Sequence, residues 1–288
     1  MSTNKTIDKA EATRAAVREG YSQIALGKES GCCSSGVSCC GSESAEADRL
    51  VKQIGYTAND LHALPEGANM GLSCGNPSAI AALSPGEVVL DLGSGGGFDV
   101  FIAGRKVGPA GRVIGIDMTH DMLDKARRNT VTHRTRTGWD NVEFRLGEIE
   151  HLPVADRSVD VVLSNCVINL SPDKLQVWRE IARVLKPGGR VAISDLALLR
   201  PLPEGVAGMV EALVGCVAGA ELITETERMM REAGLVNIAL TPKPDYVAAM
   251  SNWKDPLYLK IIEHLPTGMT PADFITSLDI KALRGPFD

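Results

Sequence analysis

The sequence lacks the features expected of a nucleic-acid-binding or membrane protein. Its formal net charge is −6, and no run of Lys or Arg is longer than Arg127-Arg128, so no basic patch for a polyanion is evident. No apolar stretch approaches the roughly 20 residues that span a bilayer. The N-terminal residues alternate charge with alanine and do not form the apolar region of a signal peptide. These absences predict a cytoplasmic protein with a small-molecule substrate, and neither nucleic acid nor membrane as a partner.

The cysteines of the sequence also lack the pattern of a structural disulfide framework. Its 7 cysteines, an odd number without an export signal, favour reduced thiols, metalloid ligands or a redox cycle over a structural disulfide framework. Cys74 and Cys216 lie far from any CxxC pair, which argues against a local zinc knuckle. The other cysteines outside the predicted sheet share a Gly- and Ser-rich segment that we expect to be a mobile thiol loop: Cys32, Cys33, Cys39 and Cys40.

Strands and helices alternate through the middle of the chain. Short β-branched and apolar runs predict strands at 88–92, 112–116, 142–146, 159–164 and 190–195. Helices are expected between them, at 98–107, 119–134 and 172–185. The last of these helices should be capped by Ser171-Pro172. The alternation predicts an α/β protein with a doubly wound, mostly parallel sheet.

The remaining segments predict three parts. Residues 1–75 would hold a helix at 5–26, the Cys-rich loop and a lid segment. Asn76-Pro77 marks a helix start, so a cofactor-binding domain would cover 76–241, with an insertion at about 197–222. A helix capped by Thr224 and an extended segment at 235–241 would close that domain. Residues 242–288 are expected to form a small irregular or α+β extension.

A glycine loop follows the first predicted strand, in Asp91-Leu92-Gly93-Ser94-Gly95-Gly96-Gly97. Gly93 and Gly95 allow a tight turn and close approach to a ligand, and Gly97 allows the next helix to pack closely. Asp117, at the end of the second strand, is placed to bind ribose hydroxyls. Together these features predict a nucleotide-type cofactor, with NAD as one alternative.

Cys166 follows the fourth predicted strand, next to Asn165. Ligands of an open parallel sheet bind outside the carboxyl ends of its strands, so both residues should face the reactive end of the cofactor. Read alone, such a cysteine is more often a small buried hydrophobic residue. Cys74 precedes the helix start at Asn76, whose N-terminus favours a thiolate. With Cys216, three distant thiolates could converge on one soft centre.

Several motifs resemble the class I S-adenosylmethionine-dependent methyltransferases, which have a Rossmann-like fold. They are the glycine loop, the acid at 117, Gly147-Glu148-Ile149-Glu150 and Leu185-Lys186-Pro187-Gly188-Gly189. The resemblance implies that S-adenosylmethionine is the cofactor. Its methionine moiety would be held by Asp91, Gly93, Ser94, Gly95 and Gly97, its ribose by Asp117, and its adenine by Met118, Glu148 and Ile149. Asn165 would complete this cofactor site.

Within that class, the sequence is similar to the arsenite S-adenosylmethionine methyltransferases. Their blocks resemble Gly71–Pro77, Ser164–Leu170 and Cys216–Ala220. The resemblance implies that Cys74, Cys166 and Cys216 bind trivalent arsenic and that an N-terminal cysteine pairs with Cys74 during turnover. Of the four candidates, Cys33 is our choice. It also implies that thioredoxin or glutathione reduces the protein thiols.

The sequence offers no Ser/His/Asp or paired-carboxylate arrangement, and methylation of an arsenic lone pair requires no general base. Asn169 and Glu221 are secondary candidates for lining the substrate pocket. Two alternatives remain open. The chain could methylate a carbon, nitrogen or oxygen acceptor, such as a quinone or a fatty acid, or it could be a non-catalytic thiol protein that senses or sequesters metalloids.

Overall fold

A seven-stranded sheet with the order β3-β2-β1-β4-β5-β7-β6 forms the centre of the molecule. The computed structural model describes residues 2–27, 49–62, 64–209, 212, 214–252 and 256–286. The strands are β1 (Val88–Leu92), β2 (Arg112–Asp117), β3 (Val142–Leu146), β4 (Val159–Asn165), β5 (Leu185–Leu198), β6 (Leu235–Lys243) and β7 (Ile275–Arg284). The first five pair in parallel, whereas β7 lies antiparallel between β5 and β6.

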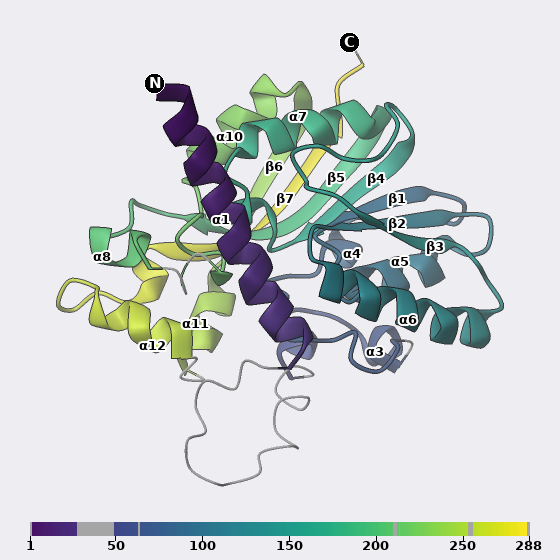
Figure 1. The fold of residues 1–288 in the computed structure, drawn as a ribbon, viewed down its shortest axis with the longest axis horizontal. Helices are drawn as coiled ribbons and strands as arrows, with labels where there is room; N and C mark the ends of the chain where they lie inside the picture. The colour runs from purple at the N-terminus through teal and green to yellow at the C-terminus, as the bar shows by residue number, and fades with distance from the viewer. Residues whose placement is uncertain are drawn as a thin grey trace, which may run out of the picture.

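Helices cover both faces of this sheet (Figure 1). The helices of the parallel half are α4 (Pro77–Ile80), α5 (Phe98–Val107), α6 (His120–Thr137) and α7 (Lys174–Val184). The other segments form α1 (Ser2–Ala25), α3 (Ala58–His62), η1 (Ile168–Leu170), α8 (Glu204–Ala207), α10 (Ile223–Glu232), α11 (Pro244–Asn252), α12 (Pro256–Glu263) and η2 (Pro271–Asp273). Figure 1 shows α7 and α10 on one side of the sheet, α4, α5 and α6 on the other, and α1 across the front.

Two apolar clusters sandwich the sheet, and a third surrounds the cysteines. Leu90, Val162 and Trp178 belong to the cluster under α7 and α10, and Phe101 and Leu163 to the one under α5 and α6. All five side chains are buried, as expected for a parallel sheet that is covered by helices on both faces. The third cluster joins α1, α11 and α12 around the cysteine segments. The sheet is therefore a rigid support for the loops at its carboxyl edge.

The predicted α/β alternation is confirmed, with corrections at some element ends. Helix α7 begins at Lys174 because the Asp173 side chain accepts a hydrogen bond from Gln176 N, so Ser171-Pro172 is not its cap. Thr224 lies inside α10, whose N-cap is Leu222. Residues 186–189 form an irregularity within β5, because the register with β4 jumps there. The region after 242, expected to form a small irregular or α+β extension, contains α11, α12 and β7, and β7 is a full strand of the central sheet.

Candidate active site

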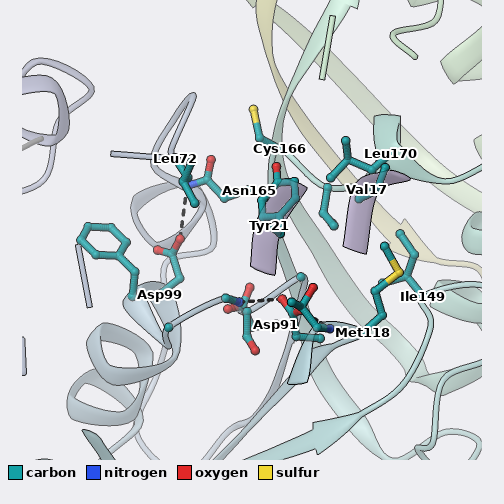
Figure 2. A pocket seen from close by; sticks show the side chains of 18 of the residues that line it. Val17, Tyr21, Leu72, Asp91, Asp99, Met118, Ile149, Asn165, Cys166 and Leu170 are labelled. Atoms are coloured by element: carbon teal, nitrogen blue, oxygen red, sulfur yellow. Dashed lines mark hydrogen bonds between the residues drawn. The ribbon is translucent and has the colours of Figure 1, made fainter. Parts of the chain in front are cut away.

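A cavity of about 1010 Å³, open to solvent, lies at the carboxyl ends of β1, β2 and β4. It sits where the strand order reverses between β1 and β4, the usual ligand position in an open parallel sheet. Figure 2 shows the Cys166 sulfur pointing away from Asp91. We call the part around Asp91, Asp117 and the glycine loop the carboxylate end, and the part around Cys74, Cys166 and Cys216 the cysteine end.

The loop after β1 presents bare backbone to the carboxylate end. Gly93, Gly95 and Gly97 have φ angles of 66°, 49° and 93°. A Cβ at Gly93 would lie 2.4 Å from Val167 Cγ2, so a side chain there would require the loop or Val167 to move. Gly93, Ser94 and Gly95 line the cavity, whereas Gly97 serves as the left-handed residue before α5.

Two buried carboxylates line the same end but differ in their partners. Asp117 Oδ2 accepts a hydrogen bond from Gly95 N at 2.9 Å, and Oδ1 accepts one from Thr119 N at 2.8 Å. Within the described residues, no hydrogen bond to the Asp91 carboxylate is found, and burial with the nearby charges of Asp99 and Asp117 raises the pKa of Asp91. A buried carboxylate without a partner is costly. This end therefore suits a ligand that brings positive charge or hydrogen-bond donors.

The side of the cavity near β2 and β3 is partly apolar. Met118 and Ile149 line it, and Figure 2 shows their side chains on the same side of the pocket. Glu148 is not among the lining residues, because its Oε2 lies 3.3 Å from Arg14 Nε. Glu150, which was not predicted, lines the cavity instead, with Oε1 3.5 Å from Arg14 Nη2.

Helix α1 forms a wall that sequence reasoning did not assign. Arg14, Val17 and Tyr21 line the cavity from successive turns, the helical spacing that places them on one face. Ser22 Oγ donates a hydrogen bond to Asp121 Oδ2 at the start of α6. Helix α1 therefore contacts both ends of the cavity, through Arg14 at the carboxylate end and Tyr21 at the cysteine end.

The structure brings the three predicted arsenic ligands together. Cys74 and Cys166 are joined by a disulfide, with their Cα atoms 6.1 Å apart. Cys216 is a free, buried thiol whose Sγ donates a hydrogen bond to Cys166 O at 2.8 Å. Cys166 and Cys216 both have positive φ, 56° and 63°, which is rare for a residue with a Cβ. Only Cys166 of the three lines the cavity itself.

The predicted redox partner of Cys74 cannot be placed. Cys33, with Cys32, Cys39 and Cys40, lies outside the described residues. The disulfide of the structure instead joins Cys74 to Cys166, two of the proposed arsenic ligands.

Asn165 fixes the position of Cys74. Its Oδ1 accepts a hydrogen bond from Cys74 N at 3.0 Å, and its Nδ2 donates to Gly75 O at 3.0 Å and Asp99 Oδ2 at 3.2 Å. From the sheet, Ser277 Oγ of β7 donates to Cys74 O at 2.8 Å. Asn165 lines the cavity as well, so the same side chain contacts both the cavity and the Cys74 backbone.

Asn169 and Asp195 fix the position of Cys216. Asn169 Nδ2 donates to Cys216 O at 3.2 Å and to Asp195 Oδ1 at 2.9 Å, and Asp195 Oδ2 accepts from Ile168 N at 3.0 Å. Burial raises the pKa of Asp195 to about 7. Sequence reasoning considered Asn169 but missed Asp195, although a lone acid in the apolar run of β5 was the available signal. Glu221, the other secondary candidate, is paired with Lys174 at 3.6 Å.

The surroundings of the Cys216 thiol favour its protonated form. Burial, and then the Asp195 carboxylate, raise the pKa of Cys216, while a hydrogen bond with Tyr21 lowers it. The Tyr21 hydroxyl also donates to Val214 O at 3.4 Å. Tyr21 is therefore the polar contact between α1 and the segment that carries Cys216.

Comparisons with known proteins agree with this geometry. The methyltransferase domain family matches residues 83–234. An arsenite methyltransferase of Halobacterium salinarum is 48% identical over 249 residues, which are 84% of this chain and 62% of that protein. One from Aquipseudomonas alcaligenes is 44% identical over 160 residues, 54% of this chain and 46% of that protein. The chain thus spans less than two thirds of the length of these relatives.

The chain also resembles a solved methyltransferase structure. The crystal structure of an arsenic(III) S-adenosylmethionine methyltransferase from Chlamydomonas reinhardtii superposes with a TM-score of 0.60, at 30% identity, over 82% of this chain and 74% of that one. Among the residues that the structure describes, no helix is both long and apolar enough for a membrane span.

Proposed function

The chain belongs to the arsenite methyltransferase family of class I S-adenosylmethionine-dependent methyltransferases, and from this premise we propose that it methylates trivalent arsenic bound by Cys74, Cys166 and Cys216. The proposal depends on one observation above all. The sulfurs of Cys74 and Cys166 are within bonding distance, and the Cys216 thiol contacts the Cys166 backbone, beside a cavity suited to the cofactor. The cellular role would be arsenic detoxification.

The carboxylate end fits S-adenosylmethionine. Asp91, buried and without a hydrogen-bond partner among the described residues, would accept hydrogen bonds from the ammonium group of the methionine moiety. Asp117 would bind the ribose diol, Met118 and Ile149 would pack on the adenine, and the glycine loop would contact the methionine moiety. When bound, S-adenosylmethionine supplies an electrophilic methyl group on a sulfonium sulfur. Glu148 and Gly97 would act indirectly, through Arg14 and through the packing of α5.

The cysteine end would hold the nucleophile. Arsenous acid reacts with three thiols to form three As–S bonds and three water molecules, so no net proton is taken up or released. Trivalent arsenic is soft and suits thiolate ligands, and it keeps a lone pair that can attack the methyl carbon. The residues act by holding arsenic near that carbon, an orientation effect worth up to roughly 7–11 kcal/mol.

The thiol chemistry requires a reductant. The Cys74–Cys166 disulfide removes two of the three ligands, so two electrons must be supplied before arsenic can bind. Each methyl transfer also raises the formal oxidation state of arsenic by two, which again calls for two electrons. We propose thioredoxin or glutathione as their source, Cys33 as the N-terminal cysteine that relays them, and the cytoplasm as the compartment, because its thiols are kept reduced.

The direct test is turnover. Purified protein is incubated with arsenite, S-adenosylmethionine and a thiol reductant, and arsenic species are separated by chromatography with mass detection. Methylated arsenicals are expected only when all three are present. If S-adenosylmethionine binds but no methylated arsenic forms under reducing conditions, the chain is a metalloid-binding protein and the proposed reaction is wrong.

A further inference from the structure

We propose that the reduced cysteine end also binds a divalent metal ion of borderline softness, Zn²⁺ or Cd²⁺, through Cys74, Cys166 and Asp195. One potential ligand atom from each residue lies within 4.8 Å of the other two. Cys74 and Asp195 are buried and Cys166 is half-buried. Once the disulfide is reduced, the three side chains form a donor set that is distinct from the three-sulfur arsenic set, because a carboxylate replaces Cys216.

The donor types match zinc. Zn²⁺ takes sulfur ligands at about 2.3 Å and carboxylate oxygen at about 2.0–2.2 Å in a tetrahedral site. Those lengths require ligand atoms roughly 3.3–3.8 Å apart, so the sulfurs of Cys74 and Cys166, which are bonded to each other in the disulfide, have to move apart after reduction. Trivalent arsenic does not favour the hard carboxylate, which makes Asp195 the residue that distinguishes the two ligands.

Asp195 is oriented to serve as a ligand. Ile168 N, Asn169 Nδ2 and Leu196 N occupy three positions on its carboxylate. The backbone N–H of Asn169 also donates to this carboxylate, so a metal would share or replace one of these donors. The hydrogen bonds also fix the side chain, as the outer contacts of metal ligands usually do.

Charge explains why a cation would be favoured here. Reduction places two ionisable thiols next to a buried carboxylate, and burying such anions without a partner is costly. A divalent cation offsets two of the three negative charges.

A phosphine or dithiol reductant gives two electrons to the Cys74–Cys166 disulfide, and two protons from water complete the two thiols. Zn²⁺ then forms two Zn–S bonds and one Zn–O bond and releases the two thiol protons. The fourth position is left to water. Zinc would compete with arsenic for Cys74 and Cys166, and this competition rests on the proposed function, whereas the zinc site itself does not.

The test uses the full chain in a background where Cys32, Cys33, Cys39 and Cys40 are Ser, so that the N-terminal thiols cannot bind metal. The protein is reduced with a phosphine, and Zn²⁺ affinity is measured by competition with a chromophoric chelator. We expect one Zn²⁺ per chain. Cys74→Ser should weaken binding by about 100-fold, and Asp195→Asn by about tenfold.

Cys216→Ser supplies the contrast. It should keep Zn²⁺ affinity within about threefold, because its sulfur is outside the cluster, but lose arsenite binding. Asp195→Cys, which replaces oxygen with sulfur, should bind Cd²⁺ more tightly than the background protein, and this gain cannot result from misfolding. If the background protein, Cys74→Ser and Asp195→Asn bind Zn²⁺ equally, the site does not exist. If zinc binds as expected but arsenite is never methylated, only the proposed function fails.

Discussion

The two ends of the cavity are built in different ways. The carboxylate end comes mainly from one compact stretch, β1, its glycine loop and the end of β2. The cysteine end is assembled from three segments far apart in the chain, which are held by side chains of Asn165, Asn169, Asp195 and Ser277. The first end should therefore tolerate changes at the second, and each can be disrupted separately.

Cys166→Ser and Cys216→Ser should show the largest difference between the effect on arsenite methylation and the effect on S-adenosylmethionine affinity. Each removes one arsenic–sulfur bond, and arsenite methylation should fall by at least about 1000-fold, because orientation of the arsenic contributes most of the acceleration. S-adenosylmethionine affinity should stay within a few-fold, since neither sulfur belongs to the carboxylate end. Turnover assays and calorimetric titration of the cofactor would measure the two effects.

Cys74→Ser tests whether the loss of activity depends on how many thiols the arsenic substrate can bind. On a substrate that already carries one methyl group, arsenic has only two positions left for thiols, so this variant should lose less activity than on arsenite. Wild-type turnover by both Cys166→Ser and Cys216→Ser would refute the thiolate site.

The carboxylate end could be predicted from sequence because its parts are local. The strand, the glycines and Asp117 follow one another at spacings that the fold dictates. The cysteine end was predicted mainly through family resemblance. Of its supports, Asn165 and Asn169 were candidates, whereas Asp195, Ser277 and Tyr21 were missed. Ser277 acts from β7, in the segment expected to be a small irregular or α+β extension, and Tyr21 acts from α1, so only tertiary packing brings them to the cysteines.

The raised pKa of Asp195 at the cysteine end should make the stability of the protein depend on pH. In the unfolded chain the Asp195 carboxyl ionises near pH 4, but in the folded protein only near pH 7. Between these values the folded state holds the extra proton, so this group makes the free energy of unfolding fall as pH rises to about 7 and contributes no further slope above it. The difference of about three pKa units corresponds to at most about 4 kcal/mol.

Asp195→Asn should remove that slope. Urea unfolding of the reduced, metal-free protein at pH 4.5–7.5 would show the variant gaining about 2–4 kcal/mol over wild type across the range. Asp140→Asn, at an exposed ion pair with Arg134, is the matched control and should change the slope by less than about 0.5 kcal/mol. Parallel pH profiles for wild type and Asp195→Asn would contradict the assignment of a raised pKa.

Asp91→Asn addresses the carboxylate end alone. A charge-assisted hydrogen bond contributes about 1.5–3 kcal/mol, so S-adenosylmethionine affinity should fall by about 10- to 100-fold. Arsenite binding, measured by protection of thiols from alkylation, should be unchanged, because Asp91 and the cysteines lie at opposite ends. A loss of arsenite binding equal to the loss of cofactor affinity would show that the two ends form a single unit.

The smallest effect is expected where α1 connects the ends. Tyr21→Phe keeps the ring that packs near Val17 but removes the hydroxyl that lowers the pKa of Cys216. One hydrogen bond contributes about 1 kcal/mol, so arsenite methylation at neutral pH should fall by about fivefold, and the deficit should shrink as pH rises and Cys216 ionises in both proteins. Ser22→Ala, one residue along the same helix, loses its bond to Asp121 instead and should show no such pH-dependent recovery. A deficit in Tyr21→Phe that is constant with pH would mean that the hydroxyl positions α1 rather than the thiol of Cys216.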